Sequence, residues 1–234
     1  MEIHLPSLGF SLRKWMDNDV NGVIMILGGR RPSSPLMGDL ASLGWDLWAV
    51  DRGLGYCRRS GMIPRVAIGD MDSASPSDLK WASDLGIAMD LHSRDKDLTD
   101  FQLALKLLAG SYHPHSPILV TGCFGGRFDH LMSSVMTFAH SDLNAMGMVD
   151  HREAIFVLRG DERLEMLFHR GAPKAISLLP VTRSRGVTTQ GLKWELSGAE
   201  LEPSFPFSVS NEARSDRIHV GLEKGILLVY VTRG

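Results

Sequence analysis

The chain has little cysteine and no long apolar segment. Cys57 and Cys123 are its only cysteines, and their wide separation is not the spacing of a metal-binding pair. The cysteine content therefore gives little support to a disulfide scaffold or a cysteine zinc site, and two reduced thiols are expected. No apolar run approaches the roughly 20 residues that cross a bilayer, and residues 1–10 lack the basic and apolar regions of a signal peptide. We therefore expect a cytoplasmic protein with no membrane partner.

The chain also lacks a surplus of positive charge. Its 25 lysines and arginines are outnumbered by 27 aspartates and glutamates, which gives a net charge of −2. Because proteins bind nucleic-acid backbones through surplus Lys and Arg, no nucleic-acid partner is expected. Any phosphate-bearing ligand must then be small and held by a few local groups. The apolar share of 44% is that of an ordinary folded protein, so a disordered chain is excluded.

The order of the apolar segments predicts two domains. From Gly22 to about Asp142, short apolar runs alternate with helical patterns, which is typical of βαβ units in a mostly parallel sheet flanked by helices. After about His151, strand-like runs recur without a long helical period, which predicts a small β-sandwich. We place the α/β domain at residues 1–146 and the β-sandwich at residues 147–234.

The same patterns predict individual elements. Strands of the first domain are expected at residues 23–27, 47–50, 65–68, 88–91 and 118–121, with helices near 36–43, 78–85 and 99–109. Strands of the second domain are expected at residues 154–158, 163–168, 175–179, 191–196, 217–220 and 226–231. The Arg-Gly-Asp-Glu segment at residues 159–162 is typical of a hairpin turn.

An acidic motif follows the strand expected at residues 65–68. It reads Gly-Asp-Met-Asp-Ser over residues 69–73. Side chains two residues apart point the same way on an extended backbone, so we expect the carboxylates of Asp70 and Asp72 to be parallel. Such a pair supplies the hard oxygen ligands that Mg²⁺ prefers. The alternative is that both aspartates only shape a turn and cap the following helix.

A second acidic cluster precedes the helix expected at residues 99–109. Asp95, Asp97 and Asp100 lie close together there, although a helix N-cap needs only one side chain, such as Asp97 or Thr99. Crowded carboxylates at the ends of neighbouring strands repel each other unless a cation neutralises them. Two acidic clusters in one parallel sheet therefore predict a metal site, with Mg²⁺ as the expected ion.

A glycine-rich motif follows the strand expected at residues 118–121. The paired glycines Gly125-Gly126 let backbone N–H groups approach phosphate oxygens, and Arg127 adds a planar, charged fork for the same oxygens. Asp129 could fix that fork or reach the metal. The alternatives are a tight turn at the glycines and a His130 that only hydrogen-bonds at the start of a helix.

Together these motifs resemble the thiamine pyrophosphokinase family. The matching patterns are G-D-x-D-S at residues 69–73, D-x-D-x-T-D at 95–100 and G-G-R-x-D-H at 125–130. Residues 49–53 are similar to the family's Asp-Gly-Gly segment, and residues 186–194 and 210–212 resemble its thiamine-binding segments. The resemblance covers most of the chain and implies an α/β domain followed by a β-sandwich.

The resemblance also implies roles for individual residues. Those implied to hold Mg²⁺ and the phosphates of ATP are Asp70, Asp72 and Asp100. Those implied to serve the nucleotide side are Asp51, Asp97, Thr99, Gly125, Gly126 and Arg127, with Asp129 supporting the centre. Those implied to contact thiamine are Trp194, Ser210 and Asn211. The alternative for Trp194 is an aromatic side chain in the core of the sandwich.

Two features of the chain depart from the family pattern. Arg52 stands where the family usually has glycine, and Arg30-Arg31 follows Gly28-Gly29 in a loop that the family often makes less basic. Either departure could alter nucleotide binding. The family works as a homodimer in which the β domains meet and thiamine lies near the subunit junction, so the resemblance implies a homodimer here.

The reaction implied is attack by the thiamine hydroxyl on the β-phosphorus of ATP, with AMP as the leaving group. Positioning and charge neutralisation drive such a displacement, and it needs no covalent enzyme intermediate. Asp97 and Asp100 are both candidates to accept the hydroxyl proton. The competing hypotheses are a pyrophosphokinase for another hydroxymethyl heterocycle, such as a pterin, and a non-catalytic module that binds thiamine or a nucleotide.

Overall fold

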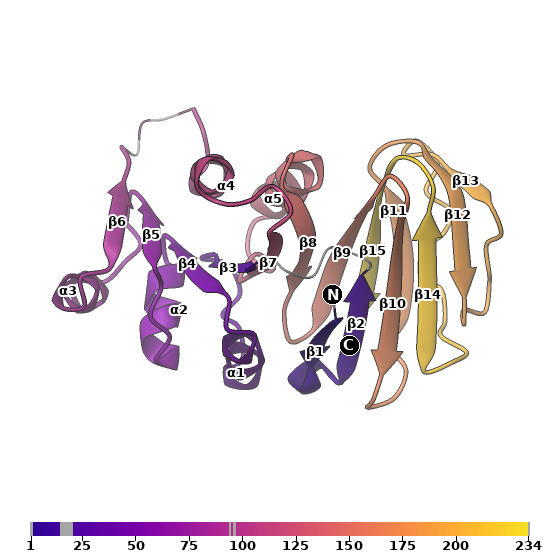
Figure 1. Ribbon diagram of the computed structural model, residues 1–234, viewed down its shortest axis with the longest axis horizontal. Helices are drawn as coiled ribbons and strands as arrows, with labels where there is room; N and C mark the ends of the chain where they lie inside the picture. Colours follow the sequence, from indigo (N-terminus) through magenta and orange to yellow (C-terminus); the bar gives the residue numbers. More distant parts are fainter. Residues whose placement is uncertain (1, 15–20, 94, 96, 234) are drawn as a thin grey trace. The chain divides into compact units, whose positions relative to one another are not determined.

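The chain divides into two compact units in a computed structural model that describes residues 2–14, 21–93, 95 and 97–233 (Figure 1). The α/β unit comprises residues 20–150, and the β unit combines residues 1–19 with 151–234. The sequence predicts a division at 146/147 with the amino terminus in the α/β domain. The difference arises because β2 (Phe10–Lys14) pairs with β1 (Glu2–Leu5) and with β10 (Glu162–Phe168), a pairing between distant segments that periodicity does not reveal.

The α/β unit is built on a parallel sheet in the order β8-β7-β3-β4-β5-β6. Its strands are β3 (Val23–Ile26), β4 (Asp46–Val50), β5 (Val66–Gly69), β6 (Ala88–Leu91), β7 (Pro117–Thr121) and β8 (Asn144–Val149). The predicted parallel sheet is confirmed. The strand order reverses between β3 and β7, and open sheets of this kind bind ligands beside the carboxyl ends of the strands at such a switch point.

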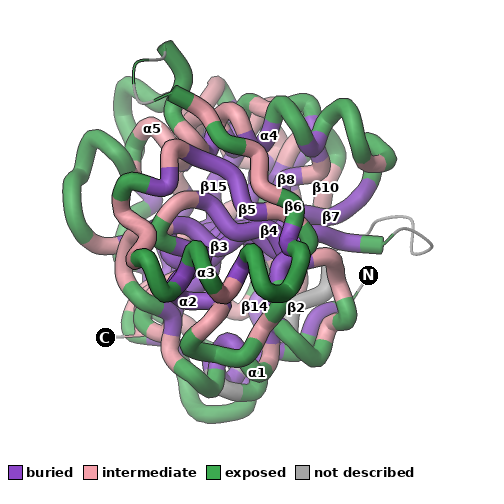
Figure 2. The backbone as a smooth tube through the Cα atoms, turned by 90° about the vertical axis from the view of Figure 1, so that its left-hand side faces the viewer, coloured by how far each residue is buried: buried purple, intermediate pink, exposed green. Residues whose placement is uncertain are grey.

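Helices cover both faces of this sheet (Figure 1). One face carries α1 (Ser34–Ser42), α2 (Gly53–Ser60) and α3 (Pro76–Asp84), and the other carries α4 (Asp100–Ser111) and α5 (Phe128–His140). Every residue of β3 and β7 is buried, as continuous apolar runs covered on both faces should be, and Figure 2 shows the buried strands behind helices with exposed outer surfaces. None of these described helices is long and apolar enough to cross a membrane.

The β unit consists of two antiparallel sheets. One has the order β1-β2-β10-β14-β12-β13, and in the other β15 pairs with both β11 and β9. The remaining strands are β9 (Glu153–Arg159), β11 (Ala175–Pro180), β12 (Ser184–Gln190), β13 (Ala199–Leu201), β14 (Arg217–Leu222) and β15 (Ile226–Thr232). Burial alternates along β14, as expected for a sheet with one covered face. The predicted β-sandwich is confirmed.

Two local predictions in the β unit are wrong. The turn at Gly160 does not close a hairpin, because β9 and β10 join different sheets. The segment at residues 191–196 forms only an isolated bridge, between Leu192 and Ala213, and at Trp194 the side chain of Asn211 takes the hydrogen bonds that a neighbouring strand would make. The Trp194 N–H donates to Oδ1 of Asn211 at 3.2 Å, and Nδ2 of Asn211 donates to the Trp194 carbonyl at 2.7 Å.

Candidate active site

A cavity of about 630 Å³ opens at the carboxyl ends of β3, β4, β5 and β7, beside the switch point of the parallel sheet. All of its lining residues belong to the α/β unit. The predicted site residues that line it are Asp51, Asp70, Asp97, Thr99, Asp100, Gly125, Gly126 and Arg127. Segments far apart in the sequence therefore meet at one cavity.

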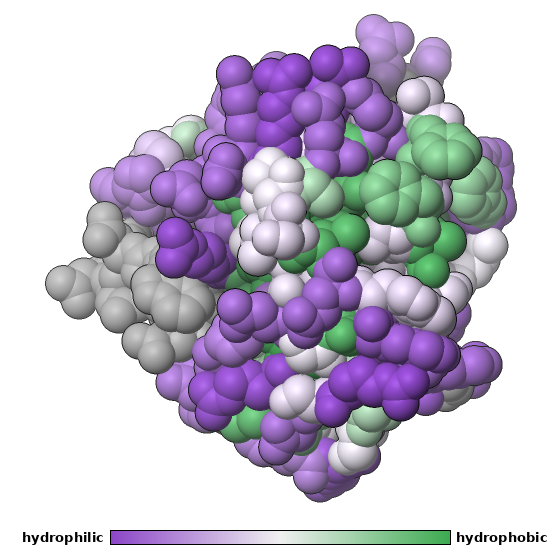
Figure 3. Space-filling model, turned by 90° about the vertical axis from the view of Figure 1, so that its right-hand side faces the viewer, coloured by the Kyte–Doolittle hydropathy of each residue, from purple (hydrophilic) through white to green (hydrophobic). Residues whose placement is uncertain are grey.

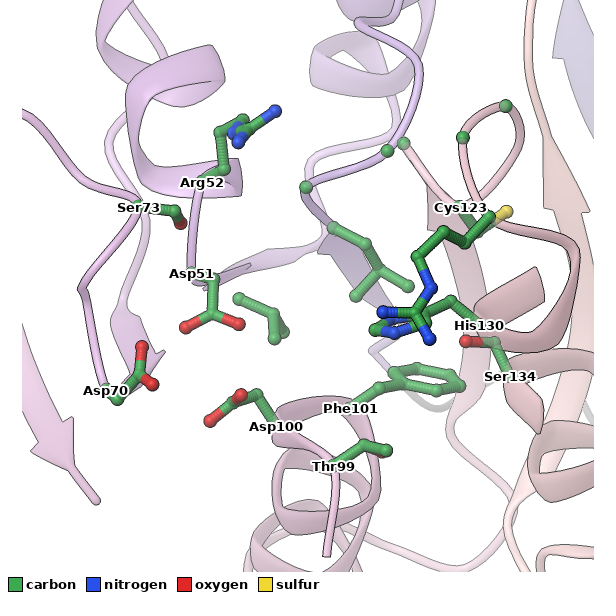
Figure 4. A pocket seen from close by; sticks show the side chains of 18 of the residues that line it. Asp51, Arg52, Asp70, Ser73, Thr99, Asp100, Phe101, Cys123, His130 and Ser134 are labelled. Atoms are coloured by element: carbon green, nitrogen blue, oxygen red, sulfur yellow. The ribbon is translucent and has the colours of Figure 1, made fainter. Parts of the chain in front are cut away.

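Three carboxylates form an acidic side of this cavity. Asp51 follows β4, Asp70 follows β5 and Asp100 opens α4, and Figure 4 shows their side chains directed toward one another. Gly69 makes this approach feasible, because a Cβ on Gly69 would overlap the Asp51 carboxylate and would lie 3.3 Å from Oδ1 of Asp100. The carboxylates of Asp51 and Asp100 thus both lie beside the Gly69 backbone.

The backbone around the acidic side is strained at two positions. Asp51 and Met71 have φ angles of 48° and 56°, in the left-handed region that residues other than glycine seldom adopt. Each such residue costs on the order of 1–3 kcal/mol, and strain of this kind concentrates at functional sites. The Asp51 N–H donates to the Ile68 carbonyl at 3.0 Å, which fixes the end of β4 against β5.

The left-handed conformation of Met71 contradicts the parallel arrangement predicted for Asp70 and Asp72. Because β5 ends at Gly69, the backbone that follows is not extended and the two side chains do not alternate as in a strand. Asp72 is exposed and does not line the cavity, and its N–H donates to Oδ1 of Asp70 at 3.0 Å. Through that bond the backbone of Asp72 orients the carboxylate of Asp70.

The acidic side fits a divalent cation that completes its coordination with a ligand. Among the described residues, no group of three or more His, Cys, Asp or Glu side chains is close enough to hold a metal ion by itself. Mg²⁺ needs no such cage, since it commonly takes one or two carboxylates and fills its remaining positions with water and substrate phosphates. Asp51 and Asp100 beside Gly69 provide such a pair, with Asp70 facing them.

The amino terminus of α4 is fixed by a capping box. Oγ1 of Thr99 accepts a hydrogen bond from the Gln102 N–H at 3.2 Å, and the Thr99 N–H donates to Oε1 of Gln102 at 2.9 Å. Thr99, rather than Asp97, is therefore the cap among the two predicted candidates. The capped helix starts at Asp100 and carries its carboxylate on the first turn.

Two glycine-containing loops form the opposite side of the cavity. The Gly29 N–H donates to the Gly122 carbonyl at 2.6 Å, and the Arg30 N–H donates to the Phe124 carbonyl at 2.5 Å. A Cβ on Gly29 would lie 2.6 Å from the Gly122 carbonyl oxygen, so only glycine permits this packing. The loops after β3 and β7 thus pack against each other as one glycine cradle at the switch point, in which Gly125 and Gly126 line the cavity without side chains that would block a ligand.

Arg127 stands at the amino terminus of α5 beside this cradle. Its Nε and Nη2 donate to the two carboxylate oxygens of Asp129 at 3.1 and 2.5 Å. The hydrogen bonds from Arg127 hold the pKa of the Asp129 carboxyl below its ordinary value, so Asp129 stays ionised. The sequence predicts that Asp129 either fixes the Arg127 fork or reaches the metal. Its geometry fits the first role, since it holds the Arg127 guanidinium and does not line the cavity.

The basic residues that depart from the family pattern differ in their surroundings. Nη1 of Arg30 forms a 2.9 Å ion pair with Asp150, whose side chain is fully buried. Arg30 does not line the cavity, whereas Arg52 does. Arg52 is the N-cap residue of α2, and its side chain makes no capping bond.

The three residues predicted to contact thiamine lie together in the β unit. Asn211 is buried and hydrogen-bonded to the backbone of Trp194 at both its N–H and its carbonyl. Ser210 has a φ angle of 57°, and its N–H donates to Oγ of Ser177 at 2.9 Å. The Trp194 side chain is 55% exposed, with the Lys193 ammonium 4.3 Å from its ring centre, so it is not the buried core aromatic of the alternative hypothesis.

Apolar side chains are exposed near these residues. Figure 3 shows apolar groups among polar ones on the face of the β unit that carries β12 and β13. Among the described residues of the β unit, the large exposed apolar side chains are Trp194, Phe205, Phe207 and Val209, and the rings of Phe205 and Phe207 lie 6.3 Å apart. Exposed aromatic groups of this kind mark a surface that binds a ligand or another protein.

Sequence reasoning missed several residues that line the cavity, among them Ser73, Phe101, Cys123 and Ser134. Ser73 and Cys123 belong to motifs that follow strands, so their positions carried a signal. Phe101 and Ser134 lie inside helical patterns, where an inward-facing residue cannot be told from a core residue by periodicity alone.

Two family models match the chain. The model of the thiamin pyrophosphokinase catalytic domain matches residues 45–149, and the model of the thiamin pyrophosphokinase vitamin B1 binding domain matches residues 165–227. The first contains all three predicted motifs of the α/β unit, and the second contains Trp194, Ser210 and Asn211.

Curated plant proteins and a solved bacterial structure are also similar. Thiamine pyrophosphokinase 2 of Oryza sativa subsp. japonica is 28% identical over 185 residues, and thiamine pyrophosphokinase 2 of Arabidopsis thaliana is 31% identical over 181 residues. Each match covers 72% of this chain and 66% of the relative, so the chain spans just under two thirds of their length. The crystal structure of thiamine pyrophosphokinase from Bacillus subtilis has a TM-score of 0.76 at 20% identity, covering 92% of this chain and 100% of that one, which shows a shared fold.

Proposed function

The chain belongs to the thiamin pyrophosphokinase family, and we propose that it transfers the pyrophosphoryl group of ATP to the hydroxyl of thiamine, giving thiamine diphosphate and AMP. The observation that carries this proposal is the polarity of the cavity. Carboxylates converge on one side, while glycine loops and arginine form the other. A phosphate chain with a bound divalent cation complements both sides, which a neutral ligand does not.

The residues of the α/β unit bind and orient the nucleotide in this proposal. Backbone N–H groups of the glycine loops and the guanidinium of Arg127 bind phosphate oxygens, and Asp129 holds the Arg127 fork in place. The carboxylates of Asp51, Asp70 and Asp100 would hold Mg²⁺, which when bound neutralises charge on the phosphates. Asp72 contributes through the hydrogen bond from its N–H to Asp70.

Catalysis then rests on positioning. The thiamine hydroxyl attacks the β-phosphorus in line with the bond to the departing AMP, and Arg127 offsets the negative charge of the phosphates. The hydroxyl proton passes to a carboxylate on the acidic side, for which Asp97 and Asp100 both remain candidates because both line the cavity. The bond between the β-phosphorus and the oxygen that links it to the α-phosphorus breaks as the new phosphorus–oxygen bond forms, and that oxygen leaves on AMP with the electron pair.

Thiamine binding is assigned to the β unit. The exposed face of Trp194 suits a flat, cationic heteroaromatic ring, and the strained Ser210 and buried Asn211 fix the surrounding backbone. We further infer a homodimer that covers the exposed Phe205 and Phe207, which sedimentation of the purified chain tests. The cytoplasmic location expected from the sequence stays a prediction.

The test is a chromatographic assay of AMP formation from ATP, run with Mg²⁺ and with or without thiamine. We expect AMP to form only when thiamine and the metal are both present. Asp70→Asn should lower kcat by at least about 100-fold, since it removes one of the carboxylates that would hold Mg²⁺ at the reacting phosphates. Asp84→Asn is the matched control, because Asp84 pairs with Lys80 at 2.8 Å outside the cavity, and it should leave kcat unchanged.

The outcomes also separate the competing hypotheses. AMP formation with a hydroxymethylpterin but not with thiamine would assign the chain to the other class of pyrophosphokinase. Tight binding of thiamine and ATP with no AMP formed would identify a non-catalytic module. The similarity to thiamine pyrophosphokinases favours neither outcome.

A further inference from the structure

Two arginines line the cavity among the described residues, Arg52 and Arg127. Of these two, Arg52 is the one that forms no salt bridge with a described carboxylate. Arg127, the other lining arginine, shares its charge with Asp129, and the nearby Arg30 is paired with the buried Asp150. Asp51 is adjacent in sequence, but Figure 4 shows its carboxylate directed toward Asp70 and Asp100 while the Arg52 side chain points away from them. The positive charge of Arg52 is therefore available to an anion in the cavity.

The base of the Arg52 side chain is held in place. A Cβ on Gly28 would lie 3.0 Å from Cβ of Arg52 and 3.6 Å from its N atom, so the loop after β3 packs against this residue. Arg52 is the N-cap residue of α2, and Gly53, the first residue of that helix, packs against the Ile26 carbonyl. The backbone and Cβ of Arg52 are thus held against the loop after β3, and its exposed guanidinium extends away from the three carboxylates (Figure 4).

We propose that Arg52 binds the α-phosphate of the nucleotide, the group that leaves as AMP. This inference rests on the proposed function, because it takes the cavity to hold ATP with its β- and γ-phosphates toward the carboxylates. In this orientation Asp51, Asp70 and Asp100 would hold Mg²⁺ beside the phosphates that are transferred, and the α-phosphate would lie toward the side of the cavity that carries Arg52. Bond cleavage adds negative charge to that phosphate, and a guanidinium there stabilises the departing group.

The inference makes Arg52 a determinant of affinity for nucleotides that carry an α-phosphate. It predicts no role in binding the nucleoside itself or thiamine. Arg52→Gln removes the charge and keeps a polar side chain of similar reach. Arg52→Lys keeps the charge but loses the planar fork, so it should retain part of the affinity.

The test is calorimetric titration of AMP and of adenosine, without metal, into the wild-type chain and its variants. Arg52→Gln should weaken AMP binding about tenfold, the loss expected for one charge-assisted hydrogen bond, and leave adenosine binding unchanged. The matched control is Arg59→Gln, because Arg59 lies on the same helix, is exposed and does not line the cavity. It should change neither affinity, and thermal unfolding of each variant checks that the fold is intact.

Three results would overturn the proposal. The first is that Arg52→Gln binds AMP as tightly as Arg59→Gln does. The second is that Arg52→Gln weakens the binding of AMP and of adenosine equally. The third is that the wild-type chain binds AMP no more tightly than adenosine. Failure of the proposed function has a different signature, namely absence of thiamine-dependent AMP formation by the wild-type chain. The binding result stands independently of that assay, because it requires neither catalysis nor metal.

Discussion

Replacement of Gly69 by alanine tests how the acidic side is assembled. Gly69 has a φ angle of 138°, which side-chain-bearing residues rarely adopt, and its new methyl group would overlap the Asp51 carboxylate. The backbone conformation alone should cost on the order of 1–3 kcal/mol in the free energy of unfolding. Displacement of the carboxylate by about 1 Å should lower kcat/KM about 100-fold, equivalent to about 2.7 kcal/mol of transition-state stabilisation.

The assay is thiamine-dependent AMP formation at increasing Mg²⁺ concentration, together with urea unfolding. Gly69→Ala should need more Mg²⁺ for half-maximal rate, because the methyl group moves one ligand and crowds Asp100. Gly86→Ala is the matched control, since Gly86 also has a positive φ of 65° but a Cβ there meets nothing within 4 Å. It should lose stability and keep its activity. The reasoning fails if Gly69→Ala retains the rate and Mg²⁺ requirement of Gly86→Ala.

Three further predictions concern stability, thiamine binding and thiol chemistry. Asp78→Asn should lower the free energy of unfolding by about 1–3 kcal/mol, because it breaks a 2.5 Å ion pair with Arg58 and a helix cap. Burial opposes ionisation of Asp78, but hydrogen bonds from Ser75 and Arg58 outweigh it and hold its pKa below the ordinary value. Urea unfolding should therefore show the full difference in the free energy of unfolding between the wild-type chain and Asp78→Asn near neutral pH. That difference should be lost as pH falls through the folded-state pKa of Asp78, and a difference that stays constant with pH would contradict this. Trp194→Ala should raise KM for thiamine several-fold and leave KM for ATP unchanged, whereas equal changes would remove Trp194 from the thiamine site. Burial raises the pKa of the Cys57 thiol to about 12, so a maleimide should label it at pH near 8 only after unfolding, and rapid labelling of the folded chain would contradict its burial.

The α/β fold could be predicted from the sequence because its signals are local. The apolar run at residues 23–27 is followed by Gly28, and the Asp-Leu-Trp-Ala-Val run of β4 is followed by Asp51, so both runs are short and end at a glycine or polar residue, as buried parallel strands do. The motifs after β5 and β7 then had to share one edge of the sheet. That step requires only strand direction, so the meeting of these motifs at one cavity could be predicted from the order of elements.

The parts that sequence reasoning missed depend on distant contacts or unusual backbone conformations. Pairing of β2 with β10 joins the amino terminus to the β unit, and no local pattern encodes the partner. The left-handed conformation of Met71 turns Asp72 away from the cavity, although methionine gives no sign of it. Asp51 acquires its place among the carboxylates only because Gly69, on the neighbouring strand, has no side chain.

The most direct test of the central claim is the identity of both products formed from ATP and thiamine. ATP radiolabelled at its γ-phosphate should give labelled thiamine diphosphate and unlabelled AMP in equal amounts, because the β- and γ-phosphates are transferred as one group. Formation of ADP with labelled thiamine monophosphate, or of inorganic phosphate alone, would show that the cavity directs attack to a different phosphorus atom.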